Sequence, residues 1–229
     1  MMERGTGNLF ENAMFTNMSE GVRPGGILLT QRLLAYCNFQ RGEIVVDLGC
    51  GTGTTVEYLW DVQKLYGIGV DISGNLLEQG KKRNVNLPLL QSAGENMPFW
   101  DCSVDGVLAE CSLSVMLSPS KILSEINRIL ISGGKLGITD LYVKDESCDF
   151  SAGDSAGIMR WSEISQLVVE HGFEIMAFED QSKLLREFVA SFIMEHGSTE
   201  KLWECIGSQS HKEKVSGLGY YLLFAQKSG

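Results

Sequence analysis

Short apolar runs alternate along the chain with segments in which apolar residues recur every three or four positions. The runs have the length and the β-branched or aromatic content of buried strands, and they lie at 44–48, 66–72, 87–91, 103–109, 135–142, 173–178 and 219–227. The segments between them have the spacing of amphipathic helices, and they begin near residues 27, 55, 73, 119, 161, 182 and 199. This alternation predicts an α/β fold in which a doubly wound, mostly parallel sheet of seven strands carries helices on both faces.

The end of the chain predicts a departure from the parallel sheet. The strand at 219–227 is expected to pair as a hairpin with the strand at 173–178, which gives the sheet an antiparallel edge strand. Two helices, at 182–195 and 199–206, form an insertion between these strands. We therefore expect a single domain over residues 1–229, with an N-terminal arm at 1–24, a loop at 143–158 and a small helical cap at about 180–216 around the ligand site.

A glycine turn follows the first strand, with the sequence D-L-G-C-G-T-G at 47–53. Glycine permits positive φ and lets a ligand lie directly against the backbone, and Thr54 or Thr55 is expected to cap the next helix. The spacing differs from the G-x-G-x-x-G pattern of dinucleotide sites, and the lysine of a phosphate loop is absent. Because Asp47 would repel a phosphate, the turn suits a ligand with a positive or zwitterionic end.

A second acid, Asp71, ends the second predicted strand. A carboxylate at this position can accept hydrogen bonds from both hydroxyls of a ribose. Ser73 is a suitable N-cap for the helix that follows, and a purely capping role for Asp71 is the alternative. Upstream, Gly25 and Gly26 interrupt the chain just before a helix. They form either a plain turn or a place where the backbone approaches the ligand.

Three segments carry a resemblance to a known family. The D-L-G-C-G-T-G turn resembles motif I, D-x-G-x-G-x-G, of the class I S-adenosylmethionine (SAM) dependent methyltransferases. The segment G-E-N-M-P-F at 94–99 is similar to D-A-E-x-L-P-F in the ubiquinone/menaquinone-biosynthesis-like (type 11) group, and R-I-L-I-S-G-G-K-L at 128–136 is similar to R-x-L-x-P-G-G-x-L. The likeness is strong over 40–141. It departs from the family at Ala93, where an acid is usual, and at Ser132, where proline is common.

The resemblance implies a Rossmann-like fold and in-line transfer of a methyl group from SAM to a small-molecule acceptor, with S-adenosylhomocysteine (SAH) as product. The implied cofactor-binding residues are Gly26, Asp47, Gly49, Cys50, Gly51, Thr54, Asp71, Ile72, Gly94, Glu95, Glu110 and Cys111. The strand at 103–109 is expected to end beside the reacting centre. Glu110 and Asp140 are therefore the candidate catalytic bases, and Ser112 and Tyr142 the candidate substrate contacts.

Composition and charge narrow the partners. The formal net charge is −10 and no basic stretch is present, which argues against a nucleic-acid substrate. No apolar segment reaches the roughly 18 residues of a membrane span, and residues 1–18 lack a signal-peptide core, so we expect a cytoplasmic protein without membrane insertion. Three histidines and six cysteines without a C-x-x-C pair predict free thiols and no metal site. The sequence selects neither an acceptor nor an oligomeric state.

Three other functions remain open. A SAM-binding sensor or accessory protein without methyl transfer would carry the same glycine turn. A nicotinamide-dependent oxidoreductase uses the same kind of sheet, although the glycine spacing argues against it. A thiol-assisted, arsenite-type methyltransferase would need Cys111, Cys148 and Cys205 to converge, whereas buried apolar thiols are the plainer explanation.

Overall fold

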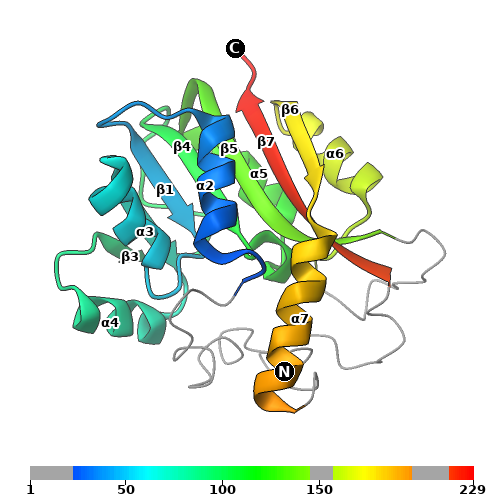
Figure 1. Cartoon of the computed structure of the whole chain (residues 1–229). Coiled ribbons are helices and arrows are strands. Elements are labelled where there is room, and N and C mark those ends of the chain that lie inside the picture. Colours follow the sequence, from blue (N-terminus) through cyan, green and yellow to red (C-terminus); the bar gives the residue numbers. More distant parts are fainter. Residues whose placement is uncertain (1–22, 145–156, 198–216) are drawn as a thin grey trace, which may run out of the picture.

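The structure is a computed structural model, and it describes residues 23–144, 157–197 and 217–229. One sheet runs through the middle of the molecule (Figure 1). Its strands are β1 (Ile44–Leu48), β2 (Tyr66–Asp71), β3 (Leu89–Gln91), β4 (Val104–Glu110), β5 (Leu130–Val143), β6 (Phe173–Asp180) and β7 (Leu218–Lys227). They lie in the order β3-β2-β1-β4-β5-β7-β6.

Neighbouring strands from β3 to β5 pair in parallel. β7 pairs antiparallel with β5 on one side and with β6 on the other, so it lies one place inside the edge that β6 forms. The predicted pairing of the last two strands is confirmed. The doubly wound, mostly parallel, Rossmann-like sheet predicted from the apolar pattern is confirmed with it.

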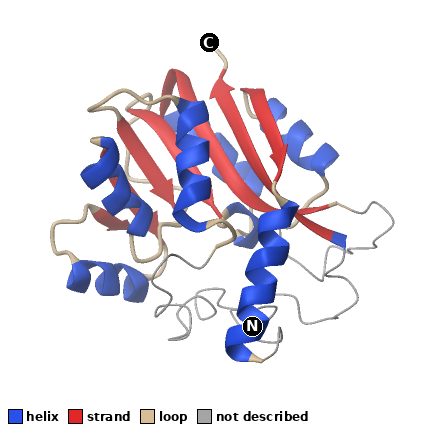
Figure 2. Ribbon diagram, in the orientation of Figure 1, coloured by secondary structure: helices blue, strands red, loops and turns tan. Residues whose placement is uncertain are grey.

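Helices cover both faces of the sheet (Figure 2). One face carries α2 (Gly26–Cys37), α3 (Thr54–Tyr58) with its π-helical continuation η2 (Leu59–Gln63), and α7 (Ser182–His196). The other face carries α5 (Pro119–Ile129) and α6 (Trp161–Glu170), and α4 (Gly74–Arg83) packs beside β3. Each helix presents one apolar stripe. In α5 that stripe is Ile122, Leu123, Ile126 and Ile129, which are all fully buried.

Several boundaries differ from the predicted ones. β3 begins at Leu89 rather than at Leu87, and β5 begins at Leu130, directly after α5. The pair Gly133 and Gly134 therefore lies inside the strand, where Gly133 has a φ of +72°. The predicted helix at 199–206 and most of the predicted N-terminal arm and loop lie outside the described residues. No helix in the described part of the chain is long and apolar enough to cross a membrane.

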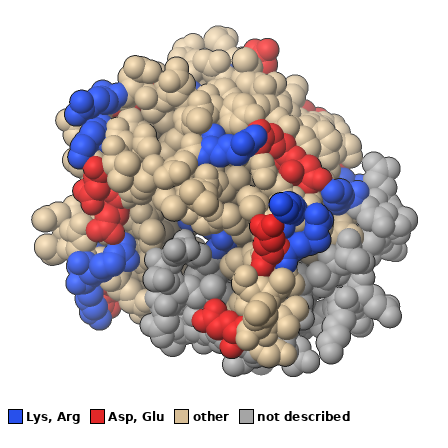
Figure 3. Space-filling model, viewed as in Figure 1, with Lys and Arg blue, Asp and Glu red and all other residues tan. Residues whose placement is uncertain are grey.

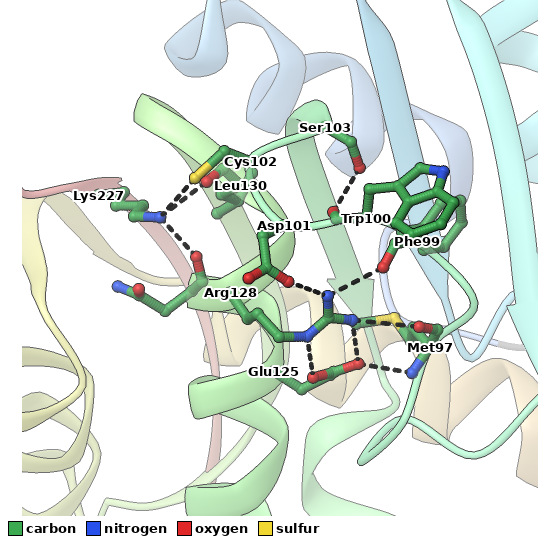
Figure 4. Close-up of polar contacts among 11 residues, drawn as sticks. Met97, Phe99, Trp100, Asp101, Cys102, Ser103, Glu125, Arg128, Leu130 and Lys227 are labelled. Atoms are coloured by element: carbon green, nitrogen blue, oxygen red, sulfur yellow. Dashed lines mark hydrogen bonds and ion pairs between the residues drawn. The ribbon is translucent and has the colours of Figure 1, made fainter.

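The loop before β4 is fixed to α5 by one guanidinium (Figure 4). Arg128 donates two hydrogen bonds of 2.7 Å to the Glu125 carboxylate and one of 2.6 Å to Asp101. It also donates to the carbonyl oxygens of Met97 and Phe99. The Glu125 carboxylate in turn accepts a 2.7 Å hydrogen bond from the Met97 amide. Arg128 lowers the pKa of Glu125, so this pair is charged and structural.

Replacing this guanidinium is expected to destabilise the fold. Arg128→Met should lower the free energy of unfolding by about 2–3 kcal/mol, because the Glu125 carboxylate and two carbonyls lose their charged donor. Urea unfolding followed by circular dichroism measures the change. Lys82→Met is the control: its ion pair with Glu78 is exposed on both sides, and its loss should leave the free energy of unfolding nearly unchanged. Equal losses in the two variants would contradict the structural role given to Arg128.

Candidate functional site

The chain reverses its direction of winding between β1 and β4, which are neighbours in the sheet. In open α/β sheets, ligands bind outside the carboxyl ends of the strands at this switch point. The glycine turn after β1, Asp71 at the end of β2 and Glu110 at the end of β4 all lie at this edge. The structure therefore brings the principal predicted site residues together.

The turn after β1 is a left-handed glycine loop. Gly49, Gly51 and Gly53 have φ values of +76°, +54° and +80°. The amides of Gly49 and Cys50 donate to the Val70 carbonyl, at 2.8 and 3.1 Å, and tie the loop to β2. A Cβ placed on Gly51 would meet nothing within 4 Å, so this backbone borders open space. That space is where a ligand can lie against the loop.

Asp71 joins the loop to the second strand. Its Oδ2 accepts a 2.8 Å hydrogen bond from the Gly51 amide, and its Oδ1 accepts one of 2.8 Å from the Ser73 amide. Ser73 itself caps α4, as expected, by accepting from the Leu76 amide. The side chain of Asp71 is only partly buried, and each oxygen keeps a second acceptor position. Asp71 thus shapes the loop and still has acceptor capacity for a diol.

The expected cap at the start of α3 is wrong. Gly53 is the N-cap, and neither Thr54 nor Thr55 caps the helix with its side chain. Thr55 instead lies 3.3 Å from Oε1 of Glu110 through its hydroxyl, on the side of the helix that faces the sheet. The Thr55 hydroxyl is oriented toward Glu110 because a buried carboxylate without hydrogen-bond donors is costly.

A buried polar network surrounds Glu110. Its carboxylate accepts hydrogen bonds of 2.9 and 3.1 Å from the Thr30 hydroxyl of α2 and forms a 3.1 Å ion pair with Arg23. The Arg23 guanidinium also donates to Thr30 and to Thr55, at 2.6 and 2.9 Å. Its Nε is buried and has no hydrogen-bond partner among the described residues. Among the described residues, this network therefore leaves one buried donor, Nε of Arg23, without a partner close to Thr55 of α3.

Asp47, in β1 next to the glycine loop, is a second charged group of this site. Its side chain is 3% exposed, and no hydrogen bond from a described residue reaches its carboxylate. Burial, together with the neighbouring charges of Glu110 and Asp71, raises its pKa to about 7, although the charge of Arg23 opposes the shift. A cationic group of a ligand would stabilise the ionised form of this buried carboxylate.

Three further predicted cofactor-binding residues differ in their exposure. Ile72 is 65% exposed beside Asp71, which leaves an apolar side chain available to a flat ring. Gly94 is buried, and a Cβ placed there would lie 3.3 Å from Leu48. Glu95 is exposed, whereas the nearby Met97 is buried in the core.

The residues that follow β4 turn sharply toward the glycine loop. Cys111 has a left-handed φ of +53°, and its Sγ lies 2.9 Å from the Tyr220 hydroxyl. Burial raises the pKa of the Cys111 thiol, so this sulfur is protonated at neutral pH. Cys148 and Cys205, its expected partners in arsenic chemistry, lie outside the described residues.

The two candidate bases lie on opposite faces of the sheet. Glu110 faces Thr30 of α2, whereas Asp140 shares its face with Ile138 and Tyr142 and lies under the 3-10 turn η3 (Leu113–Val115). Both carboxylates are buried and hydrogen-bonded. They therefore do not form an acid–base pair.

Tyr142, a candidate substrate contact, packs inside the core. Its ring makes edge contacts with Phe178 and Tyr221, with centroids 6.0 and 5.9 Å apart.

Ser112, the other candidate substrate contact, is 4% exposed, and its Oγ has no hydrogen-bond partner among the described residues. A Cβ placed on Gly49 would lie 2.5 Å from the Ser112 Cβ, so Ser112 forms the wall of the glycine loop.

Sequence reasoning did not single out Arg23. The residue belongs to R-P-G-G, which was interpreted as a chain break, and its importance depends on Glu110, 87 positions later. The only local signal was its place before Gly25 and Gly26, where the backbone was expected to approach a ligand. Among the described residues, no cluster of three or more histidine, cysteine or acidic side chains could hold a metal ion.

Comparison with known sequences agrees with this geometry. Residues 46–138, which run from β1 into β5, match the family model described as a methyltransferase domain. These residues carry a methyltransferase domain. The predicted kinship with the type 11 methyltransferases is confirmed. Over 224 residues the chain is 29% identical to the O-methyltransferase cnsE of Penicillium expansum. The match covers 88% of this chain and 78% of that protein.

Solved structures of this methyltransferase fold are similar over most of the chain. A phosphoethanolamine N-methyltransferase of Haemonchus contortus, solved in complex with SAM, has a TM-score of 0.77 at 18% identity, over 98% of this chain and 58% of that one. The [4+2]-cyclase SpnF has a TM-score of 0.70 at 21% identity, over 87% of this chain and 80% of that one. At these identities the likeness concerns the fold, which is shared by proteins with different reactions.

Proposed function

We propose that this methyltransferase domain binds SAM at the carboxyl ends of β1, β2 and β4 and transfers its methyl group to a small-molecule acceptor. One observation carries the proposal. The open glycine loop is flanked by a buried carboxylate, Asp47, and a buried guanidinium nitrogen, Nε of Arg23, neither of which has a partner for that group among the described residues. Burial opposes a rise in the pKa of Arg23, but the nearby carboxylates of Glu110 and Asp47 raise it.

This pair of opposite charges fits the amino-acid end of the cofactor. The α-ammonium group of SAM would pair with Asp47, and the α-carboxylate would accept from Arg23. Asp71 would bind the ribose hydroxyls, and the exposed side chain of Ile72 would cover the adenine ring. Each of these contacts uses a polar group or an apolar surface that the described residues leave without a partner. A turn with a purely structural role would have its buried polar groups paired within the protein.

Methyl transfer needs mainly alignment of the acceptor, the methyl carbon and the sulfur. Such positioning supplies on the order of 7–11 kcal/mol of barrier reduction. Glu110 and Asp140 are both held by hydrogen bonds, so the best acceptors are groups that ionise near neutral pH on their own. The O-methyltransferase relative makes acidic phenols and enols the first acceptors to screen, with SAH formation as the readout.

Arg23→Met is expected to weaken SAH binding about 10- to 100-fold, because one charge-assisted contact to the carboxylate is lost. Binding of 5′-methylthioadenosine, which lacks the amino-acid end, should change less than about threefold. Isothermal calorimetry with both ligands measures the difference. Arg32→Met, which removes a more exposed ion pair with Glu179, should leave both affinities unchanged. Equal losses for the two ligands in Arg23→Met would contradict the assignment.

A second candidate is a SAM-binding protein that does not transfer the methyl group. It is favoured by the two engaged carboxylates and by the cyclase that shares this fold. SAH binding without turnover on any acceptor of the screen would support this candidate. The absence of both SAM and SAH binding by well-folded protein would overturn both candidates, and NADH would be tested next.

A further inference from the structure

The turn after β4 forms one wall of the glycine loop. Gly49 has room for no side chain, because a Cβ there would lie 2.5 Å from Cβ and 3.2 Å from Oγ of Ser112. The backbone reaches this position through Cys111, whose left-handed φ of +53° is unfavourable for a residue with a side chain. A strained turn persists only where surrounding contacts hold it.

Asp140 of β5 supplies these contacts. It is 1% exposed, and its two oxygens accept hydrogen bonds from three donors. Oδ2 accepts from the Ser114 amide at 2.9 Å, and Oδ1 accepts from the Ser114 hydroxyl at 2.5 Å and from the Leu141 amide at 2.7 Å. On the other side of the turn, a Cβ placed on Gly157 would lie 2.4 Å from the Ser114 carbonyl oxygen. Ser114 is thus held between Asp140 and the backbone at Gly157.

Two residues before Ser114, the Ser112 hydroxyl lies against Gly49 and has no partner among the described residues. A buried hydroxyl without a partner is costly, and in a ligand site it marks a contact that the ligand completes. The position of this hydroxyl is set by the turn, and the turn is set by Asp140. The two serines therefore have different roles: Ser114 fixes the turn, and Ser112 faces the glycine loop at Gly49.

We propose that Asp140 is a positioning residue: through Ser114 it holds the turn that presents the Ser112 hydroxyl to the cofactor beside Gly49. This rests on the proposed function, because the ligand of the glycine loop is taken to be SAM. It assigns Asp140 a role other than the base expected from the sequence. Asp140 is 1% exposed and already accepts from three donors, so its carboxylate is shielded from a substrate proton.

The geometry makes Asp140→Asn a sharp test. An asparagine amide nitrogen at the Oδ2 position faces the Ser114 amide, and in the flipped rotamer it faces the Leu141 amide. In either case two N–H donors meet and the turn loses a hydrogen bond. Asp105→Asn is the matched control. Asp105 accepts a 2.8 Å hydrogen bond from the Ile44 amide at the opposite end of β4, far from the glycine loop along the strand.

The experiment combines SAH calorimetry with NMR of bound SAM labelled with 13C at the methyl group. We expect Asp140→Asn to weaken SAH binding at least tenfold and to shift the bound methyl resonance, with Asp105→Asn leaving both unchanged. Ser114→Ala, which removes only the hydroxyl donor, should produce the same shift with a smaller loss, and it replaces Asp140→Asn if that variant fails to fold. Ser112→Ala should weaken binding without reducing stability.

Wild-type affinity and an unmoved methyl resonance in folded Asp140→Asn or Ser114→Ala would overturn the proposal. Equal effects in Asp140→Asn and Asp105→Asn would also overturn it, since the role would then be general stability. Failure of the proposed function has a different signature, because wild-type protein would then bind neither SAM nor SAH. If wild-type protein binds SAH and the variants bind it equally well, the role of Asp140 is refuted while the proposed function stands.

Discussion

Gly51→Val is expected to abolish detectable SAH binding, with a loss of at least about 100-fold. Two effects combine at this position. The residue has a φ of +54°, where a side chain costs about 1–2 kcal/mol, and its missing Cβ points into the open space that borders the loop. A valine would occupy that space and would turn the Gly51 amide away from Asp71 Oδ2. Calorimetry with SAH measures the loss directly.

A control variant distinguishes the effect of backbone strain from the effect of filling the space that the ligand would occupy. Gly42, just before β1, has a φ of +86°, and a Cβ there would lie 3.7 Å from Tyr66, in ordinary contact. Gly42→Val should therefore lose a similar amount of unfolding free energy and keep wild-type SAH affinity. If Gly51→Val bound SAH normally, the glycine loop would not be the cofactor cradle.

The fold was predictable because its signals are local. A parallel strand covered on both faces must be an uninterrupted apolar run, and a surface helix must carry one apolar stripe, as α5 does with Ile122 and Ile126. The pairing of β6 with β7 was predictable too, since each is a continuous strand near the end of the chain. The glycine spacing at 49–53 encodes the loop in its own backbone, so the motif and its conformation agree.

The contacts inside the site were less predictable because they join distant residues. Thr55 was expected to cap α3, yet it serves Glu110, 55 positions away. Arg23 depends on the same carboxylate, and Asp140 on a serine 26 positions before it. In each case a buried carboxylate selects its donors from whatever the fold brings near, because leaving it unpaired is costly. The sequence places such carboxylates at strand ends, but it does not list their partners.

Asp47 predicts an unusual dependence of cofactor binding on pH. Burial, together with the charges of Glu110 and Asp71, raises its pKa to about 7 despite the opposing charge of Arg23. Binding an ammonium group requires the ionised carboxylate. SAH affinity is therefore expected to be constant above pH 7 and to fall about tenfold per unit as the pH decreases below 7, which corresponds to about 1.4 kcal/mol per unit. Calorimetry from pH 5.5 to 8.5 tests this.

The same carboxylate should reduce the stability of the ligand-free protein. The folded-state pKa of Asp47 lies above the ordinary value near 4, so the folded protein holds this proton more tightly than the unfolded chain. Its contribution to the free energy of unfolding therefore decreases as the pH rises from about 4 to about 7. Asp47→Asn, which carries no charge, should be more stable than wild type at pH 8 and should bind SAH weakly at every pH.

Urea unfolding at pH 5 and pH 8 measures this trade between stability and binding. Asp105→Asn is again the control, because the Asp105 carboxylate accepts a hydrogen bond from the Ile44 amide and lies away from the glycine loop. An Asp47→Asn protein that is less stable than wild type at pH 8 would show that the carboxylate is satisfied in the folded state. Stability gained together with binding lost is the combination expected of a buried charge whose partner is the ligand, since the fold alone provides no reason to keep it there.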